Sequence, residues 1–129
     1  MILDSSAVIS LLKNEDDAFE IASVMAHAPT MSISAATYLE CVLASGGPLR
    51  AAKVDELLDA VHVVPFGPDQ LPLARHAHAT YGRASGSPAR LNFGDCISYA
   101  LAKSTGQPLL FKGDDFTHTD VTPALRRTP

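Results

Sequence analysis

The sequence lacks the features that would place the chain in a membrane or send it out of the cell. No apolar run among its 129 residues approaches the roughly 18 to 20 residues that a membrane span requires. Residues 1–4 show neither the basic segment nor the apolar stretch with which a signal peptide begins. We therefore expect a cytoplasmic protein that does not associate with a membrane.

Cysteine is also scarce. The chain has only Cys41 and Cys96, and neither stands in a CxxC or Cys/His spacing. A structural zinc site is not expected, because such sites use closely spaced thiolate and imidazole ligands. We predict two buried free thiols, although a disulfide stays open if the helices that carry the cysteines meet.

The sequence does have the composition of one globular domain, residues 1–129. Hydrophobic residues make up 47% and charged residues 19%, and no internal repeat or linker interrupts the chain. The formal net charge of −4 disfavours nucleic-acid binding unless the acidic residues gather around bound cations. Two divalent ions would bring the total charge close to zero.

Short apolar segments alternate with helical patterns. The strand candidates are residues 2–3, 31–33, 61–64 and 109–111. Ser34 and Asn92 stand where helix N-caps are expected, and residues 82–90 have the glycine, serine and proline content of a loop. The alternation predicts an α/β fold, a single domain with a parallel sheet and helices on both faces.

Acidic residues occur at the ends of predicted strands and inside apolar segments. Asp4 follows the first strand, and Asp114 and Asp115 follow the last. Glu40 interrupts an apolar helical run, and Asp95 begins a helix among apolar neighbours. Ligands bind beyond the carboxyl ends of the strands in such sheets, so we expect these acids to share one rim.

Each acid also has a simpler explanation. Asp4 could cap a helix, and Asp95 could complete a capping box with Asn92. Glu40 could lie exposed on an amphipathic helix, and the two acids after the last strand could make a turn. All of them at one rim favour a bound cation instead, since clustered carboxylates otherwise repel one another. Oxygen ligands alone predict Mg²⁺ or Mn²⁺, ions suited to phosphodiester hydrolysis.

Four segments resemble the acidic blocks of VapC-type PIN domains, the toxins of bacterial toxin–antitoxin pairs. They are residues 1–7, 34–40, 89–102 and 109–116. They occur in the family's order and span nearly the whole chain. The resemblance implies a Mg²⁺-dependent endoribonuclease with a five-stranded parallel sheet that forms a homodimer and is neutralised by a cognate antitoxin.

The resemblance also implies roles for individual residues. Those that match the family's catalytic and metal-binding acids are Asp4, Glu40, Asp95 and Asp115. Ser6 resembles the hydroxyl that supports the first of these acids.

The fourth block departs from the family's usual Thr-x-Asp-x-Asp-Phe pattern. Phe111 and Gly113 replace its threonine and its first aspartate. This leaves open whether Asp114 joins Asp115 as a metal ligand.

Basic residues near these blocks are candidates for contacts with the RNA backbone. Arg90 and Lys112 lie within a few residues of Asp95 and Asp115, and we expect these two to bind phosphate. The cations for which a solvated surface is expected are Arg75, His76 and His78. No aromatic interleaving indicates base stacking, so a sequence preference on the RNA is not predicted.

Other magnesium-dependent folds fit less well. A phosphatase of the haloacid dehalogenase type needs a second aspartate where this chain has Ser6, and a receiver domain needs one at residues 64–66. The main alternative is a PIN-like module that binds RNA or a partner without cutting. The presence of all four matching acids favours the enzyme.

A surface for the second subunit or the antitoxin is also expected. Phe66, Leu71 and Leu73 surround a proline-bounded turn, although these side chains would equally suit the core. An antitoxin arginine could pair with the carboxylates and block the site.

Overall fold

The structure, a computed structural model, describes residues 1–126. Four short strands form one parallel sheet in the order β3-β2-β1-β4. The strands are β1 (Ile2–Leu3), β2 (Ser32–Ser34), β3 (His62–Val64) and β4 (Leu109–Leu110). The first strand in the sequence therefore lies inside the sheet, between β2 and β4. The predicted parallel α/β fold is confirmed.

The sheet has four strands where the family resemblance implies five. Residues 122–124 run beside β4, where the Leu109 N–H donates to the Thr122 carbonyl and the Ala124 N–H donates to the Leu109 carbonyl, both at 2.9 Å. These bonds make one isolated parallel bridge, between Leu109 and Pro123. Pro123 is tolerated there because its nitrogen faces away from β4, at the sheet edge. With β4 only two residues long, the pairing ends after this bridge.

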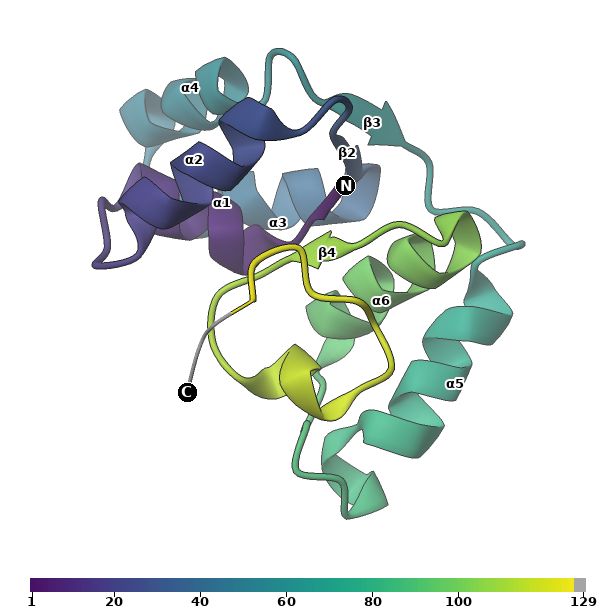
Figure 1. The fold of residues 1–129 in the computed structure, drawn as a ribbon. Coiled ribbons are helices and arrows are strands. Elements are labelled where there is room, and N and C mark those ends of the chain that lie inside the picture. Colours follow the sequence, from purple (N-terminus) through teal and green to yellow (C-terminus); the bar gives the residue numbers. More distant parts are fainter. Residues whose placement is uncertain (127–129) are drawn as a thin grey trace.

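Helices cover both faces of the sheet, as predicted. Within residues 1–126 the α-helices are α1 (Ser5–Leu12), α2 (Ala18–His27), α3 (Ala35–Ala44), α4 (Pro48–Leu57), α5 (Leu71–Tyr81) and α6 (Phe93–Thr105). The short 3₁₀-helices η1 (Arg83–Ser85) and η2 (Asp115–His118) lie in connections. Figure 1 shows α1, α2 and α4 on one side of the sheet and α5 and α6 on the other. None of these helices has the length and apolar character needed to cross a membrane.

The sheet separates two hydrophobic clusters. Neighbouring residues of a strand point to opposite faces, so even a two-residue strand contributes to both. Ile2 and Leu109 pack with α5 and α6, whereas Leu3 and Leu110 pack with α1 to α4. All four side chains are fully buried, which anchors β1 and β4 and fixes the positions where the chain leaves them.

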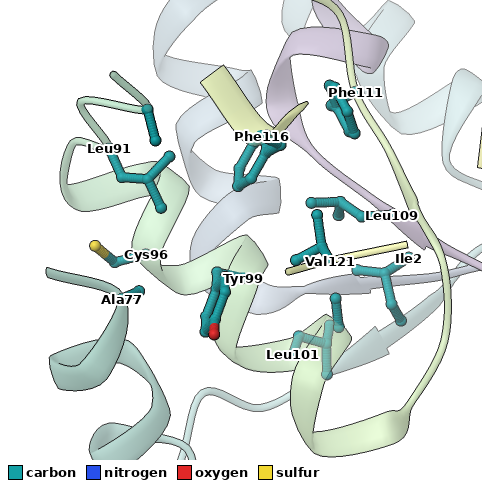
Figure 2. Packing of buried hydrophobic residues seen from close by; sticks show 12 residues of the cluster. Ile2, Ala77, Leu91, Cys96, Tyr99, Leu101, Leu109, Phe111, Phe116 and Val121 are labelled. Carbon is teal, nitrogen blue, oxygen red and sulfur yellow. The ribbon is translucent and has the colours of Figure 1, made fainter. Parts of the chain in front are cut away.

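The cluster on the α5–α6 face also holds the segment that follows β4. In Figure 2 the rings of Phe111 and Phe116 lie beside each other, and their centroids are 5.2 Å apart. Both rings are buried. Because they flank Asp114 and Asp115 in the sequence, they close the loop that carries these two acids.

The two cysteines lie in different clusters. Cys41 of α3 is buried on the α1–α4 face, and Cys96 of α6 is buried on the α5–α6 face. Both are free thiols, as predicted. The disulfide alternative is wrong, because the cysteines pack on opposite faces of the sheet.

Candidate active site

Asp4 leaves the carboxyl end of β1 and caps α1. Its Oδ2 accepts hydrogen bonds from the Ser6 backbone N–H (3.1 Å) and from the Ser6 hydroxyl (2.6 Å). Its Oδ1 accepts one from the Ser98 hydroxyl (2.6 Å). The side chain is only 2% exposed. Asp4 is thus both a helix cap and a carboxylate held in one orientation, with Ser6 in contact as expected.

Ser98 is a member of the site that the sequence reasoning missed. It is fully buried in α6, and its hydroxyl lies 3.5 Å from the Thr37 hydroxyl of α3 as well as in contact with Asp4. A signal was present, because Ser98 is a small polar residue in the otherwise mainly apolar segment 96–102, one turn after Asp95. A buried polar group in such a segment needs a hydrogen-bond partner. The neighbouring sequence does not show which residue that partner is.

Asp95 completes the capping box that the sequence predicts. The Asn92 backbone N–H donates to Asp95 Oδ2 (3.0 Å), and the Asp95 N–H donates to Asn92 Oδ1 (2.9 Å). Burial raises the pKa of Asp95 to about 7, against the hydrogen bond from Asn92, and the charges of Asp4, Asp115 and Glu40 add to the rise. Asp95 therefore takes part in the capping box at the start of α6 and belongs to an acidic cluster at once.

Glu40 of α3 lies directly against the first turn of α6. A Cβ atom at Gly94 would stand 2.8 Å from the Glu40 carboxyl carbon, so a larger residue there would require the Glu40 carboxylate to move. No group of residues 1–126 donates a hydrogen bond to the buried Glu40 Oε1. Burial raises the pKa of Glu40, a hydrogen bond from Ser5 opposes the rise, and the charge of Asp4 adds to it. The predicted alternative of a simple exposed glutamate is wrong.

The remaining acids lie at the open side of the site. Asp114 and Asp115 are exposed, and Asp115 begins η2 after Gly113, whose φ of +92° is a conformation that suits glycine. The charge of Asp115 acts on Asp95. Asp4, Glu40, Asp95 and Asp115 thus come together, and we call them the site cluster.

No cation compensates the site cluster within the described part of the chain, where no ion pair includes any of its four carboxylates. Lys112 directs its ammonium to the carboxylates of Glu15 (3.1 Å), Asp16 (3.1 Å) and Asp17 (3.4 Å). We call these four residues the lysine cluster. The Lys112 backbone N–H donates to the Ser6 hydroxyl (2.9 Å), which connects the two clusters.

The donor atoms of the site cluster fit a divalent cation, although the side chains do not enclose one as they stand. Among residues 1–126, no three acidic, thiol or imidazole groups are arranged so that they could hold a metal ion. The fit is chemical: the donors are all carboxylate oxygens, Glu40 has an unpaired buried oxygen, and the pKa values of Glu40 and Asp95 are raised. Such a set favours Mg²⁺ or Mn²⁺.

Comparisons with known proteins identify the family of the chain. The model of the PIN domain family matches residues 1–121. Ribonuclease VapC28 of Mycobacterium tuberculosis is 48% identical over 132 residues, which cover 98% of this chain and 99% of that protein.

Solved structures show the same fold at low sequence identity. The crystal structure of Mycobacterium tuberculosis VapC20, described as a sarcin-ricin loop cleaving toxin, has a TM-score of 0.77 at 16% identity and covers 98% of both chains. VapBC2 of Rickettsia felis, bound to a DNA fragment from its promoter, has a TM-score of 0.74 at 12% identity, covering 95% of this chain and 94% of that one. The family match and the full-length identity to VapC28 show that this chain belongs to the PIN-domain family, among the VapC ribonucleases of toxin–antitoxin systems.

Proposed function

We propose that this chain is a Mg²⁺- or Mn²⁺-dependent endoribonuclease toxin whose metal ligands and catalytic acids are Asp4, Glu40, Asp95 and Asp115. The observation that carries the proposal is the site cluster itself. Four carboxylates from four separate segments meet beyond the carboxyl ends of β1 and β4, and burial and mutual repulsion raise the pKa of two of them. Leaving acids so poorly compensated costs stability, and a bound cation removes that cost.

Each residue has a distinct task in this scheme. Ser6 and Ser98 hold the two oxygens of Asp4 from opposite sides. Asn92 fixes Asp95 through the capping box, and Glu40 offers an oxygen to which no group of residues 1–126 donates a hydrogen bond. When bound, two divalent ions would supply the activated water and the stabilised leaving oxygen of in-line phosphodiester hydrolysis. Asp114, exposed beside Asp115, is the least supported ligand of the set.

Contacts with the RNA backbone are assigned to Arg90 and Lys112. Arg90 is exposed five residues before Asp95, which leaves its guanidinium accessible to phosphate. Lys112 would have to exchange one carboxylate of the lysine cluster for a phosphate, and Asp16, whose side chain is 92% exposed, is the partner most easily given up. We therefore give Arg90 the larger share of the binding.

Neutralisation by a cognate antitoxin and a homodimeric state complete the proposal. Leu71 is 49% exposed at the start of α5, and Phe66 and Leu73 are half-buried beside it. This partly exposed apolar surface suits a protein partner. An antitoxin arginine inserted into the site cluster would find carboxylates without an opposing charge.

The deciding experiment is cleavage of a labelled RNA pool by the purified chain with Mg²⁺, with Mn²⁺ and with EDTA. We expect internal cuts with either metal and none with EDTA. A preparation of Asp95→Asn, purified in parallel, detects any contaminating nuclease. Binding of RNA without cutting under all three conditions would establish the alternative, a non-catalytic PIN-like module.

A further inference from the structure

Ser98 lies in the middle of a chain of hydrogen-bonding groups that runs from α3 to Asp4. Its hydroxyl donates to Asp4 Oδ1 at 2.6 Å and lies 3.5 Å from the Thr37 hydroxyl. All three side chains are buried, with at most 2% of each exposed. Because bulk water does not reach these groups, they depend on one another for hydrogen bonds.

The charge of Asp4 sets the direction of these bonds. A carboxylate must be ionised to bind a metal, and in that form it only accepts hydrogen bonds. The single hydroxyl proton of Ser98 is then committed to Asp4, so Thr37 acts as the donor toward Ser98. The Thr37 contact is long for two hydroxyl groups, which makes it the weaker of the two bonds.

The two oxygens of Asp4 are not equivalent. Among residues 1–126, Oδ2 accepts two hydrogen bonds, both from Ser6, whereas Oδ1 accepts one, from Ser98. A carboxylate oxygen offers about two acceptor sites. Oδ1 is therefore the oxygen of Asp4 that keeps a lone pair for a cation, and Ser98 is the residue that fixes its direction.

The same chain connects the three elements that carry Asp4, Glu40 and Asp95. Asp4 follows β1, and Ser98 reaches it from α6, one turn after Asp95. Thr37 reaches Ser98 from α3, one turn before Glu40. Loss of the Ser98 hydroxyl would thus free the orientation of Asp4 and loosen its register with two further carboxylates.

Building on the proposed function, we propose that Ser98 is a positioning residue that presents Asp4 Oδ1 to the divalent cation, and that Thr37 orients Ser98 for this task. Hydrogen-bond partners of metal ligands fix the orientation of those ligands, and their mutation typically lowers metal affinity or activity by about 10- to 100-fold. Ser98 is fully buried, so it acts through Asp4 and not by contact with the RNA.

The test compares Ser98→Ala with Ser10→Ala. Ser10 is also fully buried, and its hydroxyl donates at the same distance of 2.6 Å to Asp17 of the lysine cluster. Thermal melts of each purified protein at increasing Mg²⁺ measure the apparent Kd for the metal without RNA. Both variants should melt at a lower temperature than the wild type in EDTA, because each loses a buried hydrogen bond. Only Ser98→Ala should need about tenfold more Mg²⁺ for half of the maximal stabilisation.

Two further variants separate hydrogen bonding from packing. Ser98→Cys keeps the side chain small but offers only a weak S–H donor, so it should share the higher Mg²⁺ requirement even if Ser98→Ala folds poorly. Thr37→Val removes the other hydroxyl and should raise the requirement by a smaller factor, because its hydrogen bond is the longer one. In RNA cleavage, high Mg²⁺ should restore the activity of Ser98→Ala towards the wild-type level, as expected for a weakened metal site.

Equal Mg²⁺ requirements for Ser98→Ala, Ser98→Cys and Ser10→Ala would overturn the positioning role and leave Ser98 with a structural hydrogen bond. A loss of cleavage in Ser98→Ala that persists at saturating Mg²⁺ would overturn it as well. A wild type that gains no stability from Mg²⁺ and cleaves no RNA would instead overturn the proposed function, and the positioning role with it.

Discussion

The site cluster and the lysine cluster contain similar side chains in opposite electrostatic situations. Burial acts to raise the pKa of Asp17, but the hydrogen bond from Ser10 and the charge of Lys112 outweigh it and leave that pKa below its usual value. In the site cluster the hydrogen bond from the Asn92 N–H does not outweigh burial, and the pKa of Asp95 rises to about 7. Among the described residues, the acids of the lysine cluster are compensated by a cation of the chain, whereas no ion pair includes the acids of the site cluster.

The largest expected effect comes from removing one charge from the site cluster. Asp95→Asn should fold normally, because Asn92 remains the N-cap of α6 and an asparagine carbonyl oxygen can also accept the hydrogen bond from the Asn92 N–H. It should nevertheless lose RNA cleavage by about 100-fold or more, since a metal ligand loses its charge. Asp4→Asn should behave in the same way. Labelled RNA at fixed salt and Mg²⁺ measures the loss, after circular dichroism has verified the fold.

Asp16→Asn is the matched control in the lysine cluster. It removes one carboxylate from an exposed position, and Lys112 keeps its contacts to Glu15 and Asp17. Cleavage should stay at the wild-type level. Equal losses in Asp16→Asn and Asp95→Asn would show that net charge, rather than membership of the site, controls activity.

Metal binding should stabilise the site cluster and leave the lysine cluster unaffected. At a Mg²⁺ concentration of 100 times Kd, the free energy of unfolding should increase by about 2.7 kcal/mol. Thermal melts in EDTA, in Mg²⁺ and in NaCl of equal ionic strength measure this gain. Asp95→Asn should show a smaller gain. An identical melting temperature in all three solutions would argue against any metal site.

The two clusters should respond to pH with opposite sign in the metal-free protein. The folded-state pKa values of Asp95 and Glu40 are raised, so their contribution to stability is full below about pH 4 and is lost as the pH rises towards 7. The pKa of Asp17 is lowered, so its contribution is present above its ordinary pKa of 3.8 and is lost as the pH falls further.

Urea unfolding in EDTA between pH 3 and pH 8 measures both responses. Asp95→Asn should flatten the decline between pH 4 and pH 7 without changing the decline at the acid end. A wild-type curve that rises steadily from pH 4 to pH 7 would contradict the poor compensation of the site cluster.

The smallest expected effect comes from removing the positive charge of Lys112 from the lysine cluster. Lys112→Met should destabilise the fold only slightly, because exposed ion pairs contribute little to stability, and Lys112→Arg should restore most of the loss. RNA binding should weaken less than in Arg90→Ala. The dependence of RNA binding on salt distinguishes the two roles of Lys112, because loss of a true phosphate contact reduces the slope by about 1.

The parts of the site that sequence could predict are those fixed by neighbouring residues. Asp4 after its strand and Asp95 in its capping box follow from patterns within a few residues. Contacts between distant segments do not follow from such patterns. Ser98 and Asp4 are 94 residues apart, and Lys112 and Glu15 are 97 residues apart. Only the completed sheet and its helices bring such residues together.

Two further features depend on space that a sequence does not display. The close approach of the Glu40 carboxylate to Gly94 is visible only in the folded chain. A cavity between α3 and α6, with Phe93 in its wall, is likewise formed only when the two helices come together. The predicted fifth strand shrank to one bridge because β4 is itself only two residues long.

The position of β1 inside the sheet has a consequence for how the chain is made. The Asp4 N–H donates to the Leu110 carbonyl (3.0 Å), and the Asp4 carboxylate accepts from the Ser98 hydroxyl. The first acid of the site cluster therefore depends on partners that follow it in the sequence by about 100 residues. Long-range parallel pairing of this kind forms late in folding. A nascent chain therefore carries no assembled site until Asp115 has emerged as well.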